Sequence, residues 1–473
     1  MIRTLLLSIG VSLTLLFQFT SAAYAESKIK NVVYIISDDL KTSTLACYGD
    51  AVCKTPNIDR LAKEGVRFTR AYAQGTACAP SRPSLMFSRY TRDRIDTGVH
   101  QSFPELMKNN GWYSARVGKI FHMRVPGDIV AGTDGIDYPK SWNDRYNAQG
   151  MEESTPGLYE CLNQNIFQTS MENRAGARTA DRMFVNVRMD GDGSDQPDHK
   201  ASAKAIEILR EKKDEPFVLA VGFVRPHYPM VAPEKFFEPY PWEKIQMPET
   251  RPGDWDDIPR QGIPKSTSKS NGLDRYPDNQ KRMWSGYYAS VSFMDEQVGK
   301  ILDELDRLGL RESTAIVFTS DHGYHLGDHD FWQKANLHEE VLNVPLIISA
   351  PGMKPGVSDS LVELVDIYPT VTDLVGMETP ESCEGKSLVP IMKDPNATVR
   401  DYAFSYHGRS NIRTQYALRS DRWAYIQYAD GVEELYDMTA DPKQFTNRAK
   451  HDDYQTTIQE FRNALNTKLE TIK

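Results

Sequence analysis

The sequence predicts an α/β fold built on a mostly parallel sheet, followed by a small α+β subdomain. Continuous apolar and β-branched runs, typical of strands buried on both faces of a sheet, recur along the chain. Helical patterns lie between these runs, and such alternation is typical of parallel sheets. After a turn-like break at Asp394-Pro395-Asn396, the apolar runs become short and closely spaced.

The elements follow in order. Buried strands are predicted at Asn31–Ser37, Ser114–Val117, Phe217–Val224, Ala315–Thr319 and Pro345–Ser349. Helices are predicted at Asn57–Glu64 and from about Ser285 to Leu308. Gly135–Pro197 and Trp242–Asn279 lack sustained periodicity, so we expect long surface excursions that shape a cleft. The subdomain is predicted from short β-type runs at Tyr402–Tyr406, Tyr416–Arg419 and Trp423–Tyr428 and a helical pattern at Tyr454–Leu469.

The N-terminus resembles a cleaved secretory signal. Arg3 precedes an apolar run from Leu5 to Phe17, and small residues end the segment at Ala23-Tyr24-Ala25. A membrane anchor is the alternative, but a spanning helix needs roughly 20 apolar residues. We therefore expect a signal peptide at 1–25, a catalytic domain at 26–398, a C-terminal subdomain at 399–473, and export to the periplasm or beyond without a membrane span.

Charge and cysteine content restrict the function further. The net charge of -9 and pI near 5.7 argue against a nucleic-acid partner, which requires a basic face. Five cysteines in an exported chain leave at least one unpaired, and Cys78 is our candidate. Cys47 and Cys53 could form a bridge, but the sequence does not determine the pairing.

Carboxylates follow two of the predicted strands. Asp38 and Asp39 end the first, and Asp321 and His322 follow the strand at Ala315–Thr319. Strand ends of an open α/β sheet meet at the edge where ligands bind. Three carboxylates and an imidazole suit a hard cation, with calcium favoured over zinc because thiolates are absent. Alternatively, either pair could cap the next helix.

Cys78-Ala79-Pro80-Ser81-Arg82 places a nucleophile before a turn and a cation, although this string alone could occur by chance. Together with the following motifs, it resembles the type I sulfatases of the alkaline-phosphatase superfamily: Asn31–Asp39, Cys47–Asp50, Thr55–Ala62, Ser320–Gly323 and Leu326–His329. Three more segments are most similar to the iduronate-2-sulfatase branch: Val117–His122, Arg225–Pro229 and Trp332–Lys334.

The resemblance implies a large, mostly parallel or mixed central sheet flanked by helices and a short antiparallel C-terminal sheet. It implies that a formylglycine-generating enzyme oxidises Cys78, and that the hydrated aldehyde attacks sulfur. Calcium would be held by Asp38, Asp39, Asp321 and His322 together with residue 78. The chain departs from the common L-T-G-R continuation with Met86-Phe87-Ser88-Arg89, which bears on maturation and helix packing.

The resemblance also assigns roles to other residues. Arg82, Lys119 and Lys334 match positions that stabilise the transferring sulfate. His227 is expected to be the general acid, with His122 assisting the formylglycine or the sulfate. His407 and Arg409 match a substrate-binding position, where Arg409 could pair with a sugar carboxylate. For isolated residues the ordinary interpretation is a surface charge or a structural histidine.

Other histidines near the metal motif are interpreted differently: His325 and His329 are expected to be structural or rim residues, and with His338 they are not taken as a second metal site.

The resemblance thus predicts a sulfatase acting on sulfated polysaccharides or oligosaccharides, in which the sulfate is carried by a uronic acid or by a neighbouring sugar. The alternatives are a phosphonate or phosphate monoester hydrolase and a catalytically silent glycan-binding relative, which would be expected to lose the nucleophile or a metal ligand.

Overall fold

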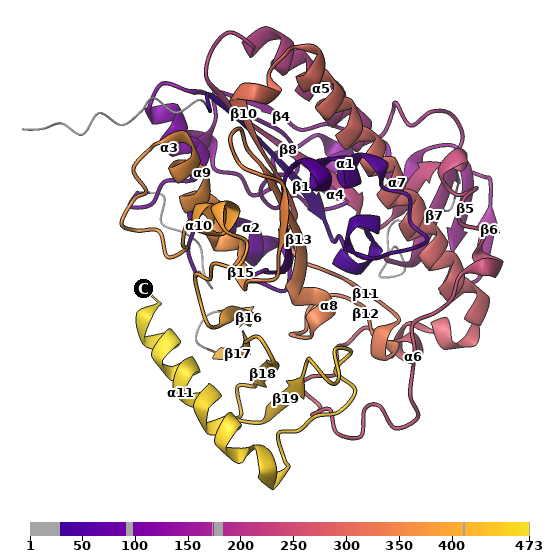
Figure 1. Ribbon diagram of the computed structural model, residues 1–473. Helices are drawn as coiled ribbons and strands as arrows, with labels where there is room; N and C mark the ends of the chain where they lie inside the picture. Colours follow the sequence, from indigo (N-terminus) through magenta and orange to yellow (C-terminus); the bar gives the residue numbers. More distant parts are fainter. Residues whose placement is uncertain (1–28, 91–97, 173, 175–182, 410–411, 473) are drawn as a thin grey trace, which may run out of the picture.

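The structure is a computed structural model that describes residues 29–90, 98–172, 174, 183–409 and 412–472 (Figure 1). The predicted signal peptide lies outside the described residues. Among the helices that the structure describes, none combines the length and apolar character needed to cross a membrane.

A nine-stranded mixed sheet forms the centre of the molecule and confirms the predicted α/β fold. β1 (Asn31–Asp38) is parallel to its neighbours β8 (Phe217–Pro226) and β10 (Thr314–Ser320). β3 (Tyr113–Gly118) and β4 (Asp144–Tyr146) extend the parallel part beyond β8. β13 (Asn343–Ser349) runs antiparallel to β10 and to β2 (Val66–Tyr72), and β14 (Gly356–Ser358) and β15 (Val362–Glu363) pair with β2.

Helices cover both faces of this sheet (Figure 1). Alternate residues of β1 belong to separate cores, because successive side chains of a strand point to opposite faces. Val33 and Ile35 pack in the core that includes α1 (Pro56–Glu64), α5 (Pro197–Lys212) and α7 (Pro277–Arg307). Val32 and Tyr34 pack in the core that includes α2 (Cys78–Phe87), α3 (Phe103–Asn109) and α9 (Ile367–Val375). Helix α7 begins earlier than predicted.

The expectation of irregular structure in Gly135–Pro197 was wrong in part. β5 (Gly157–Cys161), β6 (Ile166–Gln168) and β7 (Val185–Met189) form a second sheet with β9 (Met230–Pro233). Its strands are too short and too widely separated in sequence for their alternation to be recognised, and they gain a common core only on folding. In Trp242–Asn279, short helical turns, including α6 (Ser268–Asn271), precede the start of α7 at Pro277.

The C-terminal subdomain contains the predicted antiparallel sheet and helix. β16 (Ala403–Arg409), β17 (Ile412–Arg419), β18 (Trp423–Gln427) and β19 (Glu433–Asp437) pair in order, and β19 was not predicted. Helix α11 (Gln455–Thr471) packs on this sheet through Phe461 and Leu465 (Figure 1). The backbone N–H of Tyr406 donates to the carbonyl of Gln74 at 2.7 Å, so β16 contacts the segment that leads to Cys78.

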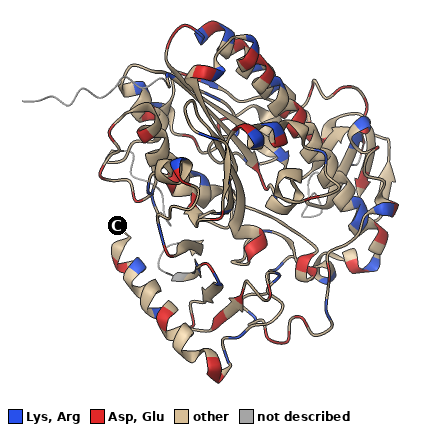
Figure 2. Cartoon of the chain, viewed as in Figure 1, with Lys and Arg blue, Asp and Glu red and all other residues tan. Residues whose placement is uncertain are grey.

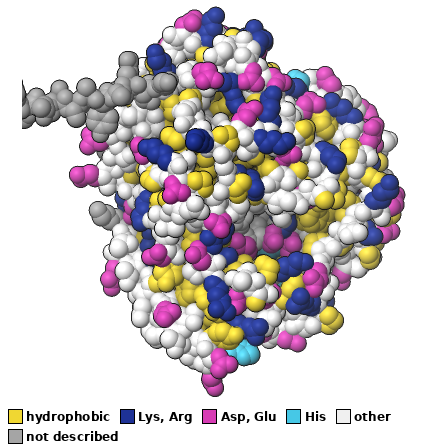
Figure 3. Space-filling view, in the orientation of Figure 1, with side chains coloured by type: hydrophobic (Ala, Val, Ile, Leu, Met, Phe, Trp, Pro, Cys, Tyr) yellow, Lys and Arg dark blue, Asp and Glu magenta, His cyan; other side chains and the backbone are white. Residues whose placement is uncertain are grey.

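Charged side chains of both signs are interspersed over the visible face (Figures 2 and 3). In a chain with a net charge of -9, an anionic substrate must therefore meet cations that are gathered locally. The end of β1 is where such cations meet.

Gly222 allows β8 to approach the backbone of Lys119 closely. A Cβ atom at Gly222 would lie 2.1 Å from the Lys119 carbonyl oxygen, so one of the two backbones would have to shift. We expect Gly222→Ala to lower the free energy of unfolding by about 1–3 kcal/mol, measured by urea denaturation, and to reduce activity by displacing Lys119. Gly127→Ala is the control, because its nearest neighbour would lie at 3.9 Å; equal stability of the two variants would contradict the prediction.

Candidate active site

The backbone turn that follows β1 brings two carboxylates to one place. Asp38 and Asp39 are both fully buried, and Asp39 has a left-handed φ of 63°. The hydroxyl of Tyr287 on α7 donates to the Asp39 carbonyl at 2.6 Å and accepts from the Lys41 N–H at 2.7 Å. These bonds hold Asp39 in a left-handed conformation, which is uncommon for residues other than glycine.

β10 supplies the next two groups. It pairs in parallel with β1 so that Ser320 lies beside Ser37, and the residues that follow both strands meet. The Asp39 N–H donates to Asp321 Oδ1 at 3.3 Å. His322 Nδ1 bonds to the Gly323 carbonyl at 2.9 Å and must donate there, so Nε2 presents its lone pair 3.3 Å from Asp39 Oδ1.

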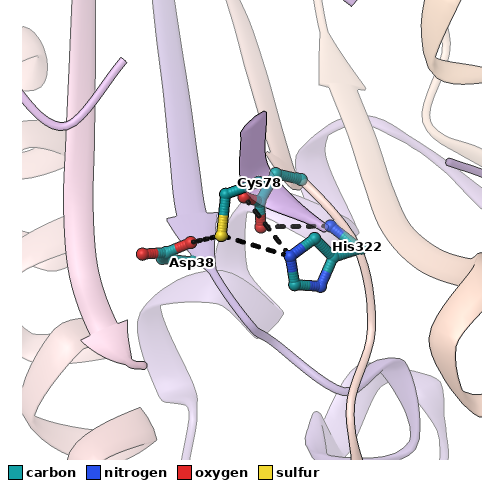
Figure 4. Close-up of side chains that lie close together, drawn as sticks. Asp38, Cys78 and His322 are labelled. Carbon is teal, nitrogen blue, oxygen red and sulfur yellow. Dashed lines mark hydrogen bonds and ion pairs between the residues drawn. The ribbon is translucent and has the colours of Figure 1, made fainter. Parts of the chain in front are cut away.

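Cys78 is the first residue of α2 and points into this cluster (Figure 4). Its Sγ lies 3.3 Å from Asp38 Oδ1 and 3.3 Å from His322 Nε2. Burial and the neighbouring carboxylates raise the pKa of the thiol well above its ordinary value. An unmodified Cys78 is therefore a neutral thiol and a poor nucleophile.

Three cations balance the carboxylates. The Arg82 guanidinium, fully buried, donates to Asp321 Oδ2 at 2.8 Å and Asp38 Oδ1 at 3.1 Å. Lys119 forms an ion pair with the second oxygen of Asp38. Lys334 Nζ lies 2.5 Å from Asp39 Oδ1 and 3.2 Å from Cys78 Sγ. Burial alone would raise the pKa of Asp38, but Lys119 and Arg82 hold it well below its usual range.

The donor set fits a hard divalent cation. Potential ligand atoms of Asp38, Cys78, Asp321 and His322 lie within 4.8 Å of one another. Asp39 Oδ2 is buried without a hydrogen-bond partner, and burial raises the pKa of Asp39. A buried, unsatisfied carboxylate oxygen is costly, and a bound cation would satisfy it.

Two further histidines approach the cluster. His227 Nδ1 bonds to the Tyr228 carbonyl at 2.7 Å, so that Nε2 faces Asp39 Oδ2 at 3.7 Å. His122 is half-buried and its Nδ1 has no hydrogen-bond partner. Burial and the charge of Lys119 lower the pKa of His122 to about 4. His122 is therefore neutral near pH 7.

The remaining residues singled out in the sequence make contacts of other kinds. His407 Nδ1 is 2.5 Å from Thr76 Oγ1, two residues before Cys78. The side chain of Arg409 lies outside the described residues. Three histidines bond to nearby polar side chains: His325 to Asn336 at 3.1 Å, His329 to Asp254 at 2.9 Å and His338 to Glu434 at 3.0 Å.

The five cysteines all lie within the described residues, and Cys47 and Cys53 do not form a disulfide bridge in this structure. Burial raises the pKa of Cys53 above its ordinary range, and it raises that of Cys47 to about 12.

Three residues that the sequence analysis did not predict support the site residues through hydrogen bonds or an ion pair. Ser81 Oγ donates to the Asp321 carbonyl at 2.5 Å, Tyr287 holds the turn after β1, and Glu152 pairs with Arg225. Ser81 lies inside the nucleophile motif, which was a usable signal. Tyr287 and Glu152 have no local signal, because their partners are distant in sequence.

Comparison with known proteins gives matches to sulfatases both among family profiles and among individual sequences. The sequence profile of the Sulfatase family matches residues 30–377, and that of "N-sulphoglucosamine sulphohydrolase, C-terminal" matches residues 327–471. A sulfatase from Formosa agariphila is 32% identical over 91% of this chain and 85% of its own. The iduronate 2-sulfatase of Homo sapiens is 33% identical over 76% and 73%, and a choline-sulfatase from Rhizobium meliloti is 30% identical over 89% and 82%. The iduronate-2-sulfatase branch is thus one of several similar branches.

Solved structures share the fold. A phosphonate monoester hydrolase from Agrobacterium radiobacter has a TM-score of 0.75 at 22% identity, covering 93% of this chain and 95% of its own. A protein solved with its substrate D-glucosamine-2-N,6-O-disulfate has a TM-score of 0.70 at 20% identity, covering 93% and 98%.

Arg82 provides a test of the charge balance. Arg82→Ala would leave Asp38 and Asp321 buried without this partner, and breaking a buried pair in this way costs about 3–5 kcal/mol. We expect a loss of that size in the free energy of unfolding, measured by urea denaturation at pH 7. Arg60→Ala removes an ion pair with Asp303 in which the side chains are 34% and 67% exposed, and it should change stability by less than about 1 kcal/mol. Similar losses in both variants would contradict the prediction.

Proposed function

Because this chain belongs to the sulfatase family and is a sulfuric ester hydrolase, we propose that it removes sulfate from sulfated polysaccharides or their oligosaccharides. The observation that carries the proposal is the position of Cys78. Its Sγ lies within reach of Asp38, His322 and Lys334, so an oxygen nucleophile at residue 78 would meet a cation site and a lysine together.

Asp38, Asp39, Asp321 and His322, with residue 78, would hold one calcium ion. When bound, the ion would polarise a sulfate oxygen and favour deprotonation of a neighbouring hydroxyl. Three carboxylates with one imidazole favour calcium over softer metals. The Gly323 carbonyl supports the site by fixing the tautomer of His322.

Residue 78 would act as formylglycine, whose hydrate supplies one hydroxyl to attack sulfur and displace the alcohol. The second hydroxyl would then lose a proton and expel sulfate as the aldehyde re-forms. The position of Cys78 supports this, because its Sγ lies 3.3 Å from both Asp38 Oδ1 and His322 Nε2. The formylglycine-generating enzyme would act before the chain folds or during export, because Cys78 is 3% exposed and Arg82 is fully buried.

The remaining side chains would handle charge and protons. Lys334, Lys119 and Arg82 stand where they can offset negative charge on the transferring sulfate. His227 Nδ1 is engaged by the Tyr228 carbonyl, so the ring would act through Nε2, and as an imidazolium it would donate the Nε2 proton to the departing alcohol oxygen. His122, neutral near pH 7, would accept or share a hydrogen bond nearby.

Several relatives support a glycan substrate. The human relative is named for iduronate and carries a 2-sulfatase activity, and another from Bacteroides thetaiotaomicron is named N-acetylglucosamine-6-O-sulfatase. We therefore favour a sulfated sugar polymer or oligomer, including esters on a uronic acid or its neighbour. His407, whose Nδ1 lies 2.5 Å from Thr76 Oγ1, would contact the sugar together with Arg409.

We expect sulfate release from at least one defined sulfated oligosaccharide by protein co-expressed with a formylglycine-generating enzyme. Ion chromatography of sulfate across a panel of glycosaminoglycan and algal oligosaccharides would measure it, and Cys78→Ala should abolish release because the nucleophile is gone. Turnover of 4-nitrophenyl sulfate should exceed that of 4-nitrophenyl phenylphosphonate. A strong preference for the phosphonate, with residue 78 verified as converted by peptide mass, would favour the phosphonate-hydrolase alternative.

Calcium should stabilise the folded protein. At a concentration of 100 times the dissociation constant, a ligand that binds only the native state adds about 2.7 kcal/mol. We expect the thermal unfolding midpoint to fall on dialysis against EGTA and to recover with calcium chloride. Asp39→Asn should show a much smaller calcium response. An identical midpoint of the wild-type protein in EGTA and in calcium would reject the calcium site.

A further inference from the structure

We propose that Glu152 is a positioning residue for the proton donor, acting on His227 through the buried guanidinium of Arg225. The inference rests on the proposed role of His227 as general acid. Glu152 lies in the connection between β4 and β5, a segment where the sequence shows no periodicity.

The pair is completely removed from solvent. Glu152 Oε2 accepts from Arg225 Nη2 at 2.6 Å, and both side chains are 0% exposed. Among the described residues, Glu152 carries the one carboxylate that forms an ion pair with Arg225. The backbone of Glu152 is left-handed, with a φ of 51°. Non-glycine residues adopt this conformation at a cost, and such residues concentrate at functional sites.

Arg225 uses its other donors to hold the turn that carries His227. Nη1 donates to the carbonyl of His227 at 3.1 Å, and Nε donates to the carbonyl of Val231 at 3.1 Å. The guanidinium therefore bridges the catalytic residue itself and the strand that follows it. Because a guanidinium is planar and its donors are fixed in direction, a shift of Arg225 would shift the carbonyl of His227 with it.

The backbone of Val224 and Arg225, which precedes His227, is held by other groups. Asp198, at the start of α5, accepts from the N–H groups of Val224 and Arg225 at 2.7 and 3.0 Å. Ser37 Oγ on β1 donates to the Arg225 carbonyl at 2.8 Å. On the His227 side of the turn, the His227 N–H donates to the Val224 carbonyl at 2.9 Å. The Arg225 guanidinium adds a second contact to the His227 backbone, at its carbonyl, and this contact links it to Glu152.

Charge makes Glu152 necessary for this arrangement. An unpaired guanidinium in a dry interior is strongly unfavourable, so Arg225 without Glu152 would move toward water or another anion. Its bonds to His227 and Val231 would then be lost. A shift of about 1 Å in a reacting group can cost on the order of 100-fold in rate.

The way in which kcat/KM depends on the leaving group distinguishes two roles for Glu152. A residue that positions the acid affects poor leaving groups most, whereas a residue that only supports the fold affects all substrates alike. Proton donation matters little when the departing phenol is acidic and much when it is basic. In full-length, converted enzyme, we expect Glu152→Gln to lower kcat/KM for phenyl sulfate about 10- to 100-fold, while 4-nitrophenyl sulfate changes less than about 3-fold. Arg225→Lys, which keeps the charge but loses the fork of donors, should show the same pattern.

The experiment also includes His227→Ala and the double variant that combines His227→Ala with Glu152→Gln. His227→Ala should also penalise phenyl sulfate selectively, and adding Glu152→Gln should cost little more, because both changes remove one function. Asp295→Asn is the matched control, since Asp295 is a buried carboxylate that accepts from the N–H groups of Asn57 and Ile58 at the start of α1. It should reduce stability without changing the ratio of the two substrates.

Either of two results would overturn the inference. If Glu152→Gln slows both esters equally while His227→Ala remains selective, Glu152 supports the fold only. If His227→Ala slows both esters equally, His227 is not the acid and the positioning role fails with it. Sulfatase activity itself is judged independently by the Cys78→Ala control. Thermal unfolding of each variant identifies any that fail to fold.

Discussion

The active site depends on a balance of buried charge at the end of β1. Asp38, Asp39 and Asp321 are fully buried, and carboxylates in such an environment are strongly disfavoured unless they are paired. Arg82 from α2, Lys119 from the end of β3 and Lys334 from the turn after Trp332 supply the opposing charge. Segments far apart in sequence must therefore come together, and the close approach of Gly222 on β8 to the backbone of Lys119 is one of the contacts that brings them together.

The C-terminal subdomain takes part in this arrangement through the nucleophile segment. The Gln74 carbonyl accepts from the Tyr406 N–H, Ser405 Oγ donates to the Ala73 carbonyl at 2.6 Å, and His407 contacts Thr76. These contacts attach β16 to the residues immediately before α2. The first turn of α2 therefore has support on both sides, from β16 and from the carboxylate cluster, and Cys78 can be held in place without being exposed.

Much of this organisation was predictable because its signals are local. Apolar runs predicted β1, β3, β8, β10 and β13. Polar residues at two strand ends predicted that Asp38, Asp39, Asp321 and His322 would meet. The short strands of the second sheet were missed because none carries a pattern of its own. Glu152 and Tyr287 were missed for a different reason: each acquires its partner, Arg225 or the Asp39 carbonyl, only when distant segments pack together.

His322 and His227 are controlled by the same local device with different consequences. Each ring bonds through Nδ1 to the carbonyl of the residue that follows it, which leaves Nε2 directed at the carboxylates. His322 is surrounded by ligand atoms, so its lone pair suits a cation. His227 Nε2 lies 3.7 Å from Asp39 Oδ2, and it carries a proton only when the ring is an imidazolium; in the proposed mechanism this proton would pass to the leaving oxygen. The neighbouring backbone carbonyl thus sets the tautomer of both rings. In the proposed mechanism, His322 would hold the cation and His227, as an imidazolium, would supply the proton.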